Sequence, residues 1–501
     1  MLKNFVYSNS FFCLVLLISL NSLTFGGCHR RLPEAQEESG IHISALQAPV
    51  TDLDPIRASD TNTQFIINNA WNGLVSWSLE EGIQPALAER WQYLQNGRKL
   101  VVKLRQRLHF SDGSPLLAMD VVRHFDRLVQ TKGYFQHSYQ GVRIFSRSRY
   151  EVEFHLKAPD PDFLNLLAGT PGKIVKRGVS SGGGWVGAGP FVPERTDYGW
   201  RLRRGVHDFE PQVGPKEIRF PVLSPELAID AARRGAVDDL VLFEFPSGTD
   251  LGSFGFNKLV QPLWATWAIG LNLKSPKLQN RDLRCALLRN YRSENFVSQV
   301  EPSHLVAKGM VPFGAAGYLS LDWPPEEVRN QGKGNPIPIE LFIPEELPNF
   351  PSVQQFLLRY NPASGLAAFV LRKAPFRWII DRLSTLDMPA FLLSFNAELP
   401  AARFFLESLH SQASGNLFGL KDRVIDKVVE DTRSAEFSAA FLSQRYGDFH
   451  SRLRDICVAA PLMQVKHEAW VRSCVEGVRL SPVSEGYFLI RGVRSRCNRK
   501  H

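Results

Sequence analysis

The chain is poor in the residues that build metal and redox sites. Its 501 residues include only six cysteines and five methionines, and no two cysteines have the Cys-x-x-Cys spacing. No Cys/His spacing typical of zinc is present, so the sequence predicts no metal site and no cofactor. The glycine-rich segment 178–189 is not followed by the Gly-Lys-Ser/Thr of a phosphate-binding loop, and His-Glu-x-x-His is absent. We therefore expect this segment to be a plain loop or hinge crossing, and the chain not to be an enzyme.

Long apolar runs are missing outside the N-terminus. Phe11–Leu20 is an apolar run that follows Lys3, and small residues stand directly before Cys28. This order is typical of a secretory signal. Small residues before a cysteine also resemble a bacterial lipobox, with Phe25 where an aliphatic residue is usual. By that resemblance Cys28 is lipidated and becomes the first mature residue; a plain signal peptide and an uncleaved anchor are the alternatives.

Acidic residues are fewer than basic ones, which gives a net charge of +9 and a pI of about 9.2. Such a balance can indicate nucleic acid, anionic membrane or anionic ligands as partners. The basic residues are spread along the chain, however, and neither zinc-finger spacing nor a basic heptad helix accompanies them. We expect solvated surfaces and a basic tail, and no nucleic-acid partner. The densest basic groups are Arg201, Arg203 and Arg204, and then Arg491, Arg494, Arg496, Arg499 and Lys500.

Four cysteines lie beyond the N-terminal segment, at Cys285, Cys457, Cys474 and Cys497. In an oxidising compartment they can form up to two disulfides. We expect one bond between Cys474 and Cys497, because both lie in the C-terminal part of the chain. The alternative is that these residues are isolated buried thiols.

The length of the chain predicts two or three domains, and its patterning predicts an α/β fold. Alternation of apolar and polar residues indicates strands at 41–50, 100–110, 149–156, 218–223, 237–243, 267–273, 338–343 and 391–395. Helical spacing indicates helices at 63–74, 118–130, 225–234, 282–291, 352–358, 426–433 and 438–459. The strand, helix and strand between 218 and 243 fit a βαβ unit.

Several motifs together resemble the family 5 extracellular solute-binding proteins, which include oligopeptide- and dipeptide-binding proteins. Gln84–Trp91 is similar to the family's Pro-Ala-Leu-Ala-x-x-Trp, and Leu104–Val122 to its Leu-Arg…Phe-x-Asp-Gly-x-Pro…Ala-x-Asp-Val run. With the remaining matches, the motifs follow the family's order and cover nearly the whole mature chain. The remaining matches are Asn69–Val75, Gly187–Phe191, Lys216–Ile218, Ala231–Asp238, Ile269–Asn272, Asp282–Leu287, Asn416–Gly419 and Ile425–Asp426.

The resemblance implies a two-lobed, periplasmic-binding-protein-like fold of type II, in the large peptide-binding class, with a hinge between the lobes. It implies a monomeric lipoprotein of the periplasm or cell envelope that captures oligopeptides or a related small solute for ABC permease and ATPase subunits. The alternative is a binding protein of the same fold with a non-peptide ligand, or a sensor, chaperone or adhesin. The expected organisation is a signal peptide at 1–27, a tether at 28–40, an N-terminal lobe at 41–265 with a subdomain near 70–165, a C-terminal lobe at 266–475, and a return with a basic tail at 476–501.

The resemblance also implies a ligand position. In peptide-binding members an aspartate on a short strand of the second lobe, four residues before a proline, holds the ligand's α-ammonium. Here that position is Asn396, which keeps an acceptor but loses the charge. Because charged hydrogen bonds contribute about twice as much as neutral ones, either Glu398 or another acid substitutes, or the solute is not a peptide with a free amino end.

The other candidate ligand contacts are Trp264, Trp267, Phe395 and Arg403. Aromatic rings supply apolar walls at low entropy cost, and an arginine can bind a carboxylate with two hydrogen bonds. For Trp267 the alternative is ordinary core, and for Arg403 a surface helix. The motif residues themselves are expected to define the fold and not the ligand site, and the carboxylate pairs Glu80-Glu81 and Asp238-Asp239 to be solvated surface.

Overall fold

The computed structural model describes most of the chain from Gly40 to Cys497. The residues inside this range that it does not describe are 59, 79, 132–138, 140, 161, 179–183, 207–212, 242–244, 247, 316, 324–334, 346, 348, 363–365, 386, 398–404, 407–408, 414–415, 433–438 and 484–488.

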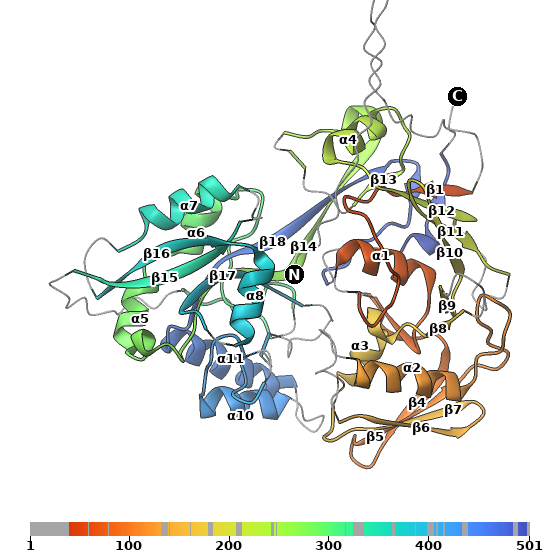
Figure 1. The fold of residues 1–501 in the computed structure, drawn as a ribbon, viewed down its shortest axis with the longest axis horizontal. Helices are drawn as coiled ribbons and strands as arrows, with labels where there is room; N and C mark the ends of the chain where they lie inside the picture. Colours follow the sequence, from red (N-terminus) through yellow and green to blue (C-terminus); the bar gives the residue numbers. More distant parts are fainter. Residues whose placement is uncertain are drawn as a thin grey trace, which may run out of the picture.

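Two lobes lie side by side and are joined by two long strands (Figure 1). The joining strands are β14 (Phe256–Leu271) and β18 (Ala459–Arg472), which pair antiparallel along most of their length. We call the part built from the elements before β14, together with β19 and β20, the first lobe. The second lobe contains the elements between β14 and β18.

The first lobe combines two four-stranded sheets with short hairpins. One sheet has the order β1-β12-β11-β10 and the other β4-β5-β7-β6. Its strands are β1 (Ile41–Ile43), β2 (Val75–Ser78), β3 (Gly82–Pro85), β4 (Ala88–Leu94), β5 (Lys99–Leu104), β6 (Arg143–Ser148), β7 (Glu151–His155), β8 (Val175–Arg177), β9 (Trp185–Gly187), β10 (Phe191–Thr196), β11 (Gly199–Arg204), β12 (Glu217–Pro221), β13 (Asp239–Leu240), β19 (Val475–Glu476) and β20 (Arg494–Ser495). Its helices are α1 (Thr61–Ala70), α2 (Ala118–Gln130), α3 (Phe163–Ala168) and α4 (Pro225–Arg233).

The second lobe is an α/β layer on the sheet β13-β18-β14-β17-β15-β16, which extends into it from the first lobe. Its own strands are β15 (Ile337–Pro344), β16 (Ala367–Ala374) and β17 (Ala390–Asn396). Its helices are α5 (Arg281–Leu288), α6 (Ser293–Gln299), α7 (Phe350–Arg359), α8 (Phe376–Ser384), α10 (Arg423–Thr432) and α11 (Ala439–Asp455). Because β14 and β18 belong to this sheet, motion between the lobes must bend these two strands.

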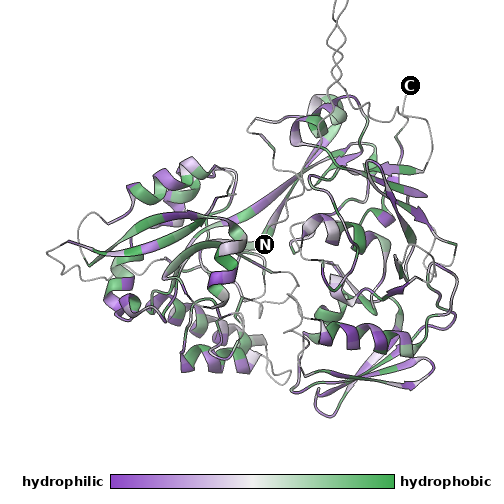
Figure 2. Ribbon diagram, in the orientation of Figure 1, coloured by the Kyte–Doolittle hydropathy of each residue, from purple (hydrophilic) through white to green (hydrophobic). Residues whose placement is uncertain are grey.

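Local sequence explains where several helices begin. The side chains of Asp60, Ser224 and Asn280 accept hydrogen bonds from backbone N–H groups in the first turns of α1, α4 and α5. At α2 the carboxylate of Asp120 accepts from the backbone N–H of Leu117 at 2.9 Å. Figure 2 shows hydrophilic and hydrophobic residues alternating around the helices of both lobes, as expected for helices that cover sheets.

The expected elements are present, with different bounds. The helix expected at 118–130 matches α2 in full, whereas the strand expected at 100–110 ends at Leu104 and the one expected at 267–273 is the last part of the much longer β14. The helix expected at 438–459 ends at Asp455, because the chain then turns and begins strand β18 at Ala459.

The βαβ prediction was wrong in one respect. The order β12, α4, β13 is present, but β12 and β13 belong to different sheets. β1 pairs in parallel with β12, and Ser44, which follows it, bridges Asp239 of β13. Strand β1, from the start of the described chain, therefore lies between β12 and β13, which would be direct neighbours in a simple βαβ unit.

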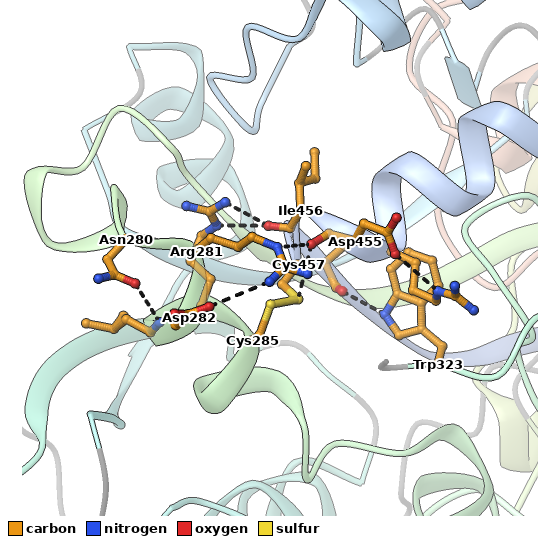
Figure 3. The surroundings of a disulfide bond; sticks show 12 residues. Asn280, Arg281, Asp282, Cys285, Trp323, Asp455, Ile456 and Cys457 are labelled. Atoms are coloured by element: carbon orange, nitrogen blue, oxygen red, sulfur yellow. Dashed lines mark hydrogen bonds and ion pairs between the residues drawn. A yellow bond between two sulfur atoms is a disulfide. The ribbon is translucent and has the colours of Figure 1, made fainter. Parts of the chain in front are cut away.

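The disulfide between Cys474 and Cys497 is present, and Cys285 and Cys457 form a second one. The second bond joins α5 to the turn between α11 and β18 (Figure 3). Next to it, the buried guanidinium of Arg284 donates to the backbone carbonyl oxygens of Leu278, Gln279 and Ile456 at 2.8–3.0 Å. The alternative of isolated thiols is excluded for all four cysteines.

Stability is expected to fall in mild acid because of His124. This side chain is buried in the first lobe, its Nε2 lies 2.8 Å from the carbonyl oxygen of Pro171, and burial lowers its pKa to about 4. In the unfolded chain the same histidine takes up a proton near pH 6.5. The contribution of neutral His124 to the free energy of unfolding is therefore complete above pH 6.5 and is lost as the pH falls towards 4. We expect the free energy of unfolding to be about 2 kcal/mol lower at pH 5 than at pH 7 from this group. Urea unfolding of His124→Gln should show a correspondingly weaker pH dependence; an unchanged dependence would contradict the assignment.

Candidate functional site

The end of β17 carries Asn396, the residue expected at the ligand's amino end. Asn396 is exposed, and its Oδ1 accepts the Ser394 hydroxyl at 2.5 Å. Its cross-strand partner on β14 is Ala265. Asn396 therefore presents a neutral amide at a strand end beside the joining strand β14.

Phe395 and Trp264 lie together on one face of this sheet. Phe395 packs against the apolar cluster that contains Trp264, and its ring stacks on Phe418 with centroids 5.4 Å apart. The backbone of Trp264 accepts from the N–H of Ala397 at 2.7 Å and donates to the carbonyl of Pro482 at 2.7 Å. The structure therefore brings these two predicted residues to the point where β14, β17 and the C-terminal return meet.

Trp267 points to the opposite face. Neighbouring residues of a strand alternate between faces, and Trp267 is paired with Ser394, not with Phe395. Its indole packs against the cluster that contains Ile269 and Leu271, between the sheet and α5 to α7. The structure thus separates Trp267 from Trp264. The remaining predicted site residues, Glu398, Arg403 and Cys28, lie outside the described residues.

Gln464 of β18 fixes the joining strands at this point, and sequence reasoning missed it. The register between β14 and β18 shifts between Pro262 and Thr266. The buried amide of Gln464 donates to the carbonyls of Leu263 and Phe313 at 2.9 Å each, and accepts from the N–H of Phe313 at 3.0 Å. A single side chain in the middle of β18 therefore holds a β-bulge and a second-lobe loop together.

Trp77 is a second residue that sequence reasoning missed. It lies on β2 of the first lobe, is half-buried, and packs against the second-lobe cluster around Trp264. The two indoles meet edge to face, with centroids 6.4 Å apart. Only the alternation of the short segment Val75–Ser78 marks Trp77 in the sequence, and this does not show which lobe its ring reaches.

The family-like motif residues make contacts inside the fold, as expected. Asp112 forms an ion pair with Lys176 at 3.0 Å, and Gly113 turns the chain with a φ of 81°. The N–H of Ser111 donates to the carbonyl of Gly187 at 3.0 Å. The ion pair and the hydrogen bonds from Ser114 and Lys176 outweigh the effect of burial and lower the pKa of Asp112. This motif therefore joins β8 and β9 to the turn before α2.

The carboxylate pair Asp238-Asp239 is buried, so its assignment to the surface was wrong; Glu80-Glu81 is exposed as expected. Asp239 lies between His42 Nε2 at 2.5 Å and the Ser44 hydroxyl at 2.7 Å. Burial raises the pKa of the Asp239 carboxyl, against the effect of these hydrogen bonds. Asp239 contacts both His42 and Ser44. In a catalytic triad, by contrast, the histidine lies next to the hydroxyl of the nucleophilic serine. The cluster also has no exposed surface, which makes it a structural link between β1 and β13.

Sequence reasoning also overlooked a short hydrolase pattern, because 178–182 reads Gly-x-Ser-x-Gly. In hydrolases the serine of this motif stands on a sharp turn from a strand to a helix. Here β8 ends at Arg177 and pairs antiparallel with β9, which begins at Trp185. The pattern therefore stands between two strands that pair with each other, and not between a strand and a helix.

In the described part of the chain, no three His, Cys, Asp or Glu side chains gather in a way that could hold a metal ion. Of the helices that the structure describes, none is both long and apolar enough to cross a membrane.

Two lobes joined by a strand pair define the class of two-lobed periplasmic binding proteins. Residues 82–334, just over half of the chain, match the bacterial extracellular solute-binding proteins, family 5 (middle region). The chain belongs to this family, whose members are the solute-binding proteins of ABC importers. The recognition made from the motifs and the expected fold class are both confirmed.

Two curated relatives match short parts of the chain. A probable deoxycholate-binding periplasmic protein of Escherichia coli K12 is 39% identical over 80 residues, which are 16% of this chain and 15% of that protein. A glutathione-binding protein of the same strain is 28% identical over 158 residues, which are 30% of this chain and 31% of that protein. The chain thus aligns with less than a third of the length of these relatives.

Solved structures match nearly the whole chain. HbpA2 of Haemophilus parasuis has a TM-score of 0.74 at 19% identity and covers 91% of this chain and 100% of its own. OppA of Haemophilus influenzae, in complex with the peptide RPPGFSPFR, has a TM-score of 0.74 at 17% identity and covers 92% and 99%. At these identities the likeness shows the fold.

Proposed function

We propose that this protein is the lipid-anchored solute-binding subunit of an ABC importer in the bacterial cell envelope. It captures oligopeptides or a related small solute between its lobes and delivers it to the membrane permease, which acts with ATPase subunits. The observation that carries the proposal is the two-lobed family 5 fold, in which the long paired strands β14 and β18 join the lobes. Such a connection lets two bodies close over a solute by bending a few residues.

The names of similar proteins support a peptide or a related small solute. Structures of similar fold include a murein tripeptide-binding protein of E. coli and OppA with a bound nonapeptide. The names of the curated relatives refer to glutathione and to deoxycholate. Deoxycholate has no ammonium group, which is consistent with a neutral Asn396.

The proposed solute contacts are at the end of β17 and beside Trp264. Asn396 follows Phe395 on β17 and points to the other face, so a solute contacts both side chains only where it passes around the exposed end of the strand. Glu398 and Arg403 stay part of this proposal. The proposed lobe boundary at 265–266 falls within β14, next to the bulge held by Gln464.

Native mass spectrometry of the protein purified from its own envelope tests the proposal. We expect a co-purifying solute of peptide size that is released on unfolding. The same spectra should show a mature chain that begins at Cys28 and carries acyl chains, and that runs as a monomer. Turnover of peptides by an empty protein would contradict a binding role, and an unmodified Cys28 would remove the lipid anchor from the proposal.

Restoring the acid at the end of β17 is expected to increase affinity for peptides with a free amino end. In Asn396→Asp, a charge-assisted hydrogen bond replaces a neutral one, and the difference corresponds to about a tenfold tighter Kd. Calorimetry with a tripeptide and its N-acetylated form measures this directly, because only the peptide with a free amino end should bind more tightly to the variant. Equal gains for both forms, or none, would place the amino end elsewhere.

A further inference from the structure

We propose that this protein selects solutes with aromatic side groups and does not require a free amino end, and that Trp77 is a specificity-determining residue. The inference rests on the proposed function, because it names the class of solute that the two lobes take between them.

The first lobe contributes an aromatic ring to the second-lobe cluster. Trp77 lies on the hairpin of β2 and β3, where Ile83 is its cross-strand partner. Its half-buried indole contacts Trp264 edge to face, and Trp264 is itself anchored by backbone hydrogen bonds to Ala397 and Pro482. Trp77 is therefore placed where the lobes meet, and it leaves part of its ring exposed beside the joining strand.

The second lobe presents several more rings around this point. Phe395 stacks on Phe418, and Tyr318 and Tyr446 pack half-buried against the same cluster. Tyr446 belongs to α11, and its pKa is raised by burial and by the charge of Asp162, the residue before α3 of the first lobe. The lobes thus approach each other at Trp77, whose ring contacts Trp264. Aromatic rings offer large contact areas at low entropy cost, and pairs of rings gain a further contribution from edge-to-face or offset stacking.

Among the residues that the structure describes, the polar side chains next to Phe395 are neutral. Its cross-strand partner is Thr266, whose buried hydroxyl has no hydrogen-bond partner among the described residues. The next residue is Asn396, whose amide oxygen already accepts from Ser394. A hydroxyl and an amide bind neutral amides as readily as they bind other polar groups, but they provide no counter-charge for an ammonium group. Side chains of the solute, and not its amino end, should therefore dominate its affinity.

Four tripeptides separate these contributions: triphenylalanine and trialanine, each with a free and with an N-acetylated amino end. Calorimetry on the full mature protein, freed of co-purified solute, should give at least about a tenfold tighter Kd for the phenylalanine peptides. Acetylation should change Kd by less than about threefold. Trp77→Ala should weaken the phenylalanine peptides about tenfold and leave trialanine unchanged, whereas Trp77→Phe keeps most of the affinity. Tyr198→Ala is the matched control, because this aromatic residue is exposed on the β10–β11 hairpin of the first lobe.

Each alternative result has a distinct meaning. Equal affinity for phenylalanine and alanine peptides, or a loss on acetylation, overturns the inference and leaves the proposed function in place. An equal loss for all four peptides in Trp77→Ala assigns Trp77 to lobe closure, and also overturns its role in specificity. If no peptide binds, native mass spectrometry decides: a released solute without an aromatic group overturns the inference, and the absence of any solute overturns the proposed function as well.

Discussion

Replacing Cys285 and Cys457 together by alanine is expected to lower the free energy of unfolding by about 5 kcal/mol. The bond closes a loop of 172 residues, and a cross-link of that length removes more freedom from the unfolded chain than any short one does. It also ties α5 to the turn before β18, next to the carbonyls that Arg284 satisfies. Chemical unfolding of the variant, followed by circular dichroism, measures the change.

The second disulfide provides the matched control. Cys474 and Cys497 are 23 residues apart, so the same change there is expected to cost about 3 kcal/mol. Because this bond lies in the C-terminal return to the first lobe, the two variants should also destabilise different parts of the molecule. A larger effect from the shorter loop would contradict an origin in the unfolded chain.

Gly187→Ala is expected to destabilise the first lobe by about 4 kcal/mol. A Cβ at this position would lie 2.3 Å from Cδ1 and 2.4 Å from Cγ of Trp71, whose side chain has no exposed surface. The ring is enclosed between α1 and the β10–β12 sheet and cannot move aside without displacing its neighbours. Thermal unfolding and the yield of folded protein both report the loss.

Gly184→Ala in the same segment is the control for this prediction. A Cβ at Gly184 would meet nothing within 4 Å, so the variant is expected to unfold like the parent protein. If both substitutions had the same effect, the cause would be the general stiffness of the segment and not the contact with Trp71.

The order of the motifs predicted the family and the fold, and the reason is visible in the contacts. Asp112 pairs with Lys176, and the carbonyl of Gly187 accepts from Ser111, so these motif residues make contacts that hold the fold together. The helix at 118–130 could be predicted to the residue because its apolar stripe and Asp120 act within a few residues of each other.

The candidate site was only partly predictable. Phe395 and Trp264 were proposed as ligand contacts from their residue type and do lie together, but Trp267 was assigned to the same group although the sheet directs it to the opposite face. The two tryptophans are three residues apart on β14, so strand alternation directs them to opposite faces, but the strand was expected to begin only at Trp267 and Trp264 was not recognised as part of it. Trp77 was missed because its contact with Trp264 joins residues of different lobes.

The sequence by itself determined the elements, their order and the turn that Gly113 makes, because backbone preference and amphipathic spacing act over a few residues. Only the tertiary structure decided which distant residues meet. It placed β1 between β12 and β13, buried Asp239 against His42, and brought Cys285 to Cys457. The physical reason is that the path of the chain within each lobe sets these contacts, and a side chain's burial depends on partners that lie more than a hundred residues away.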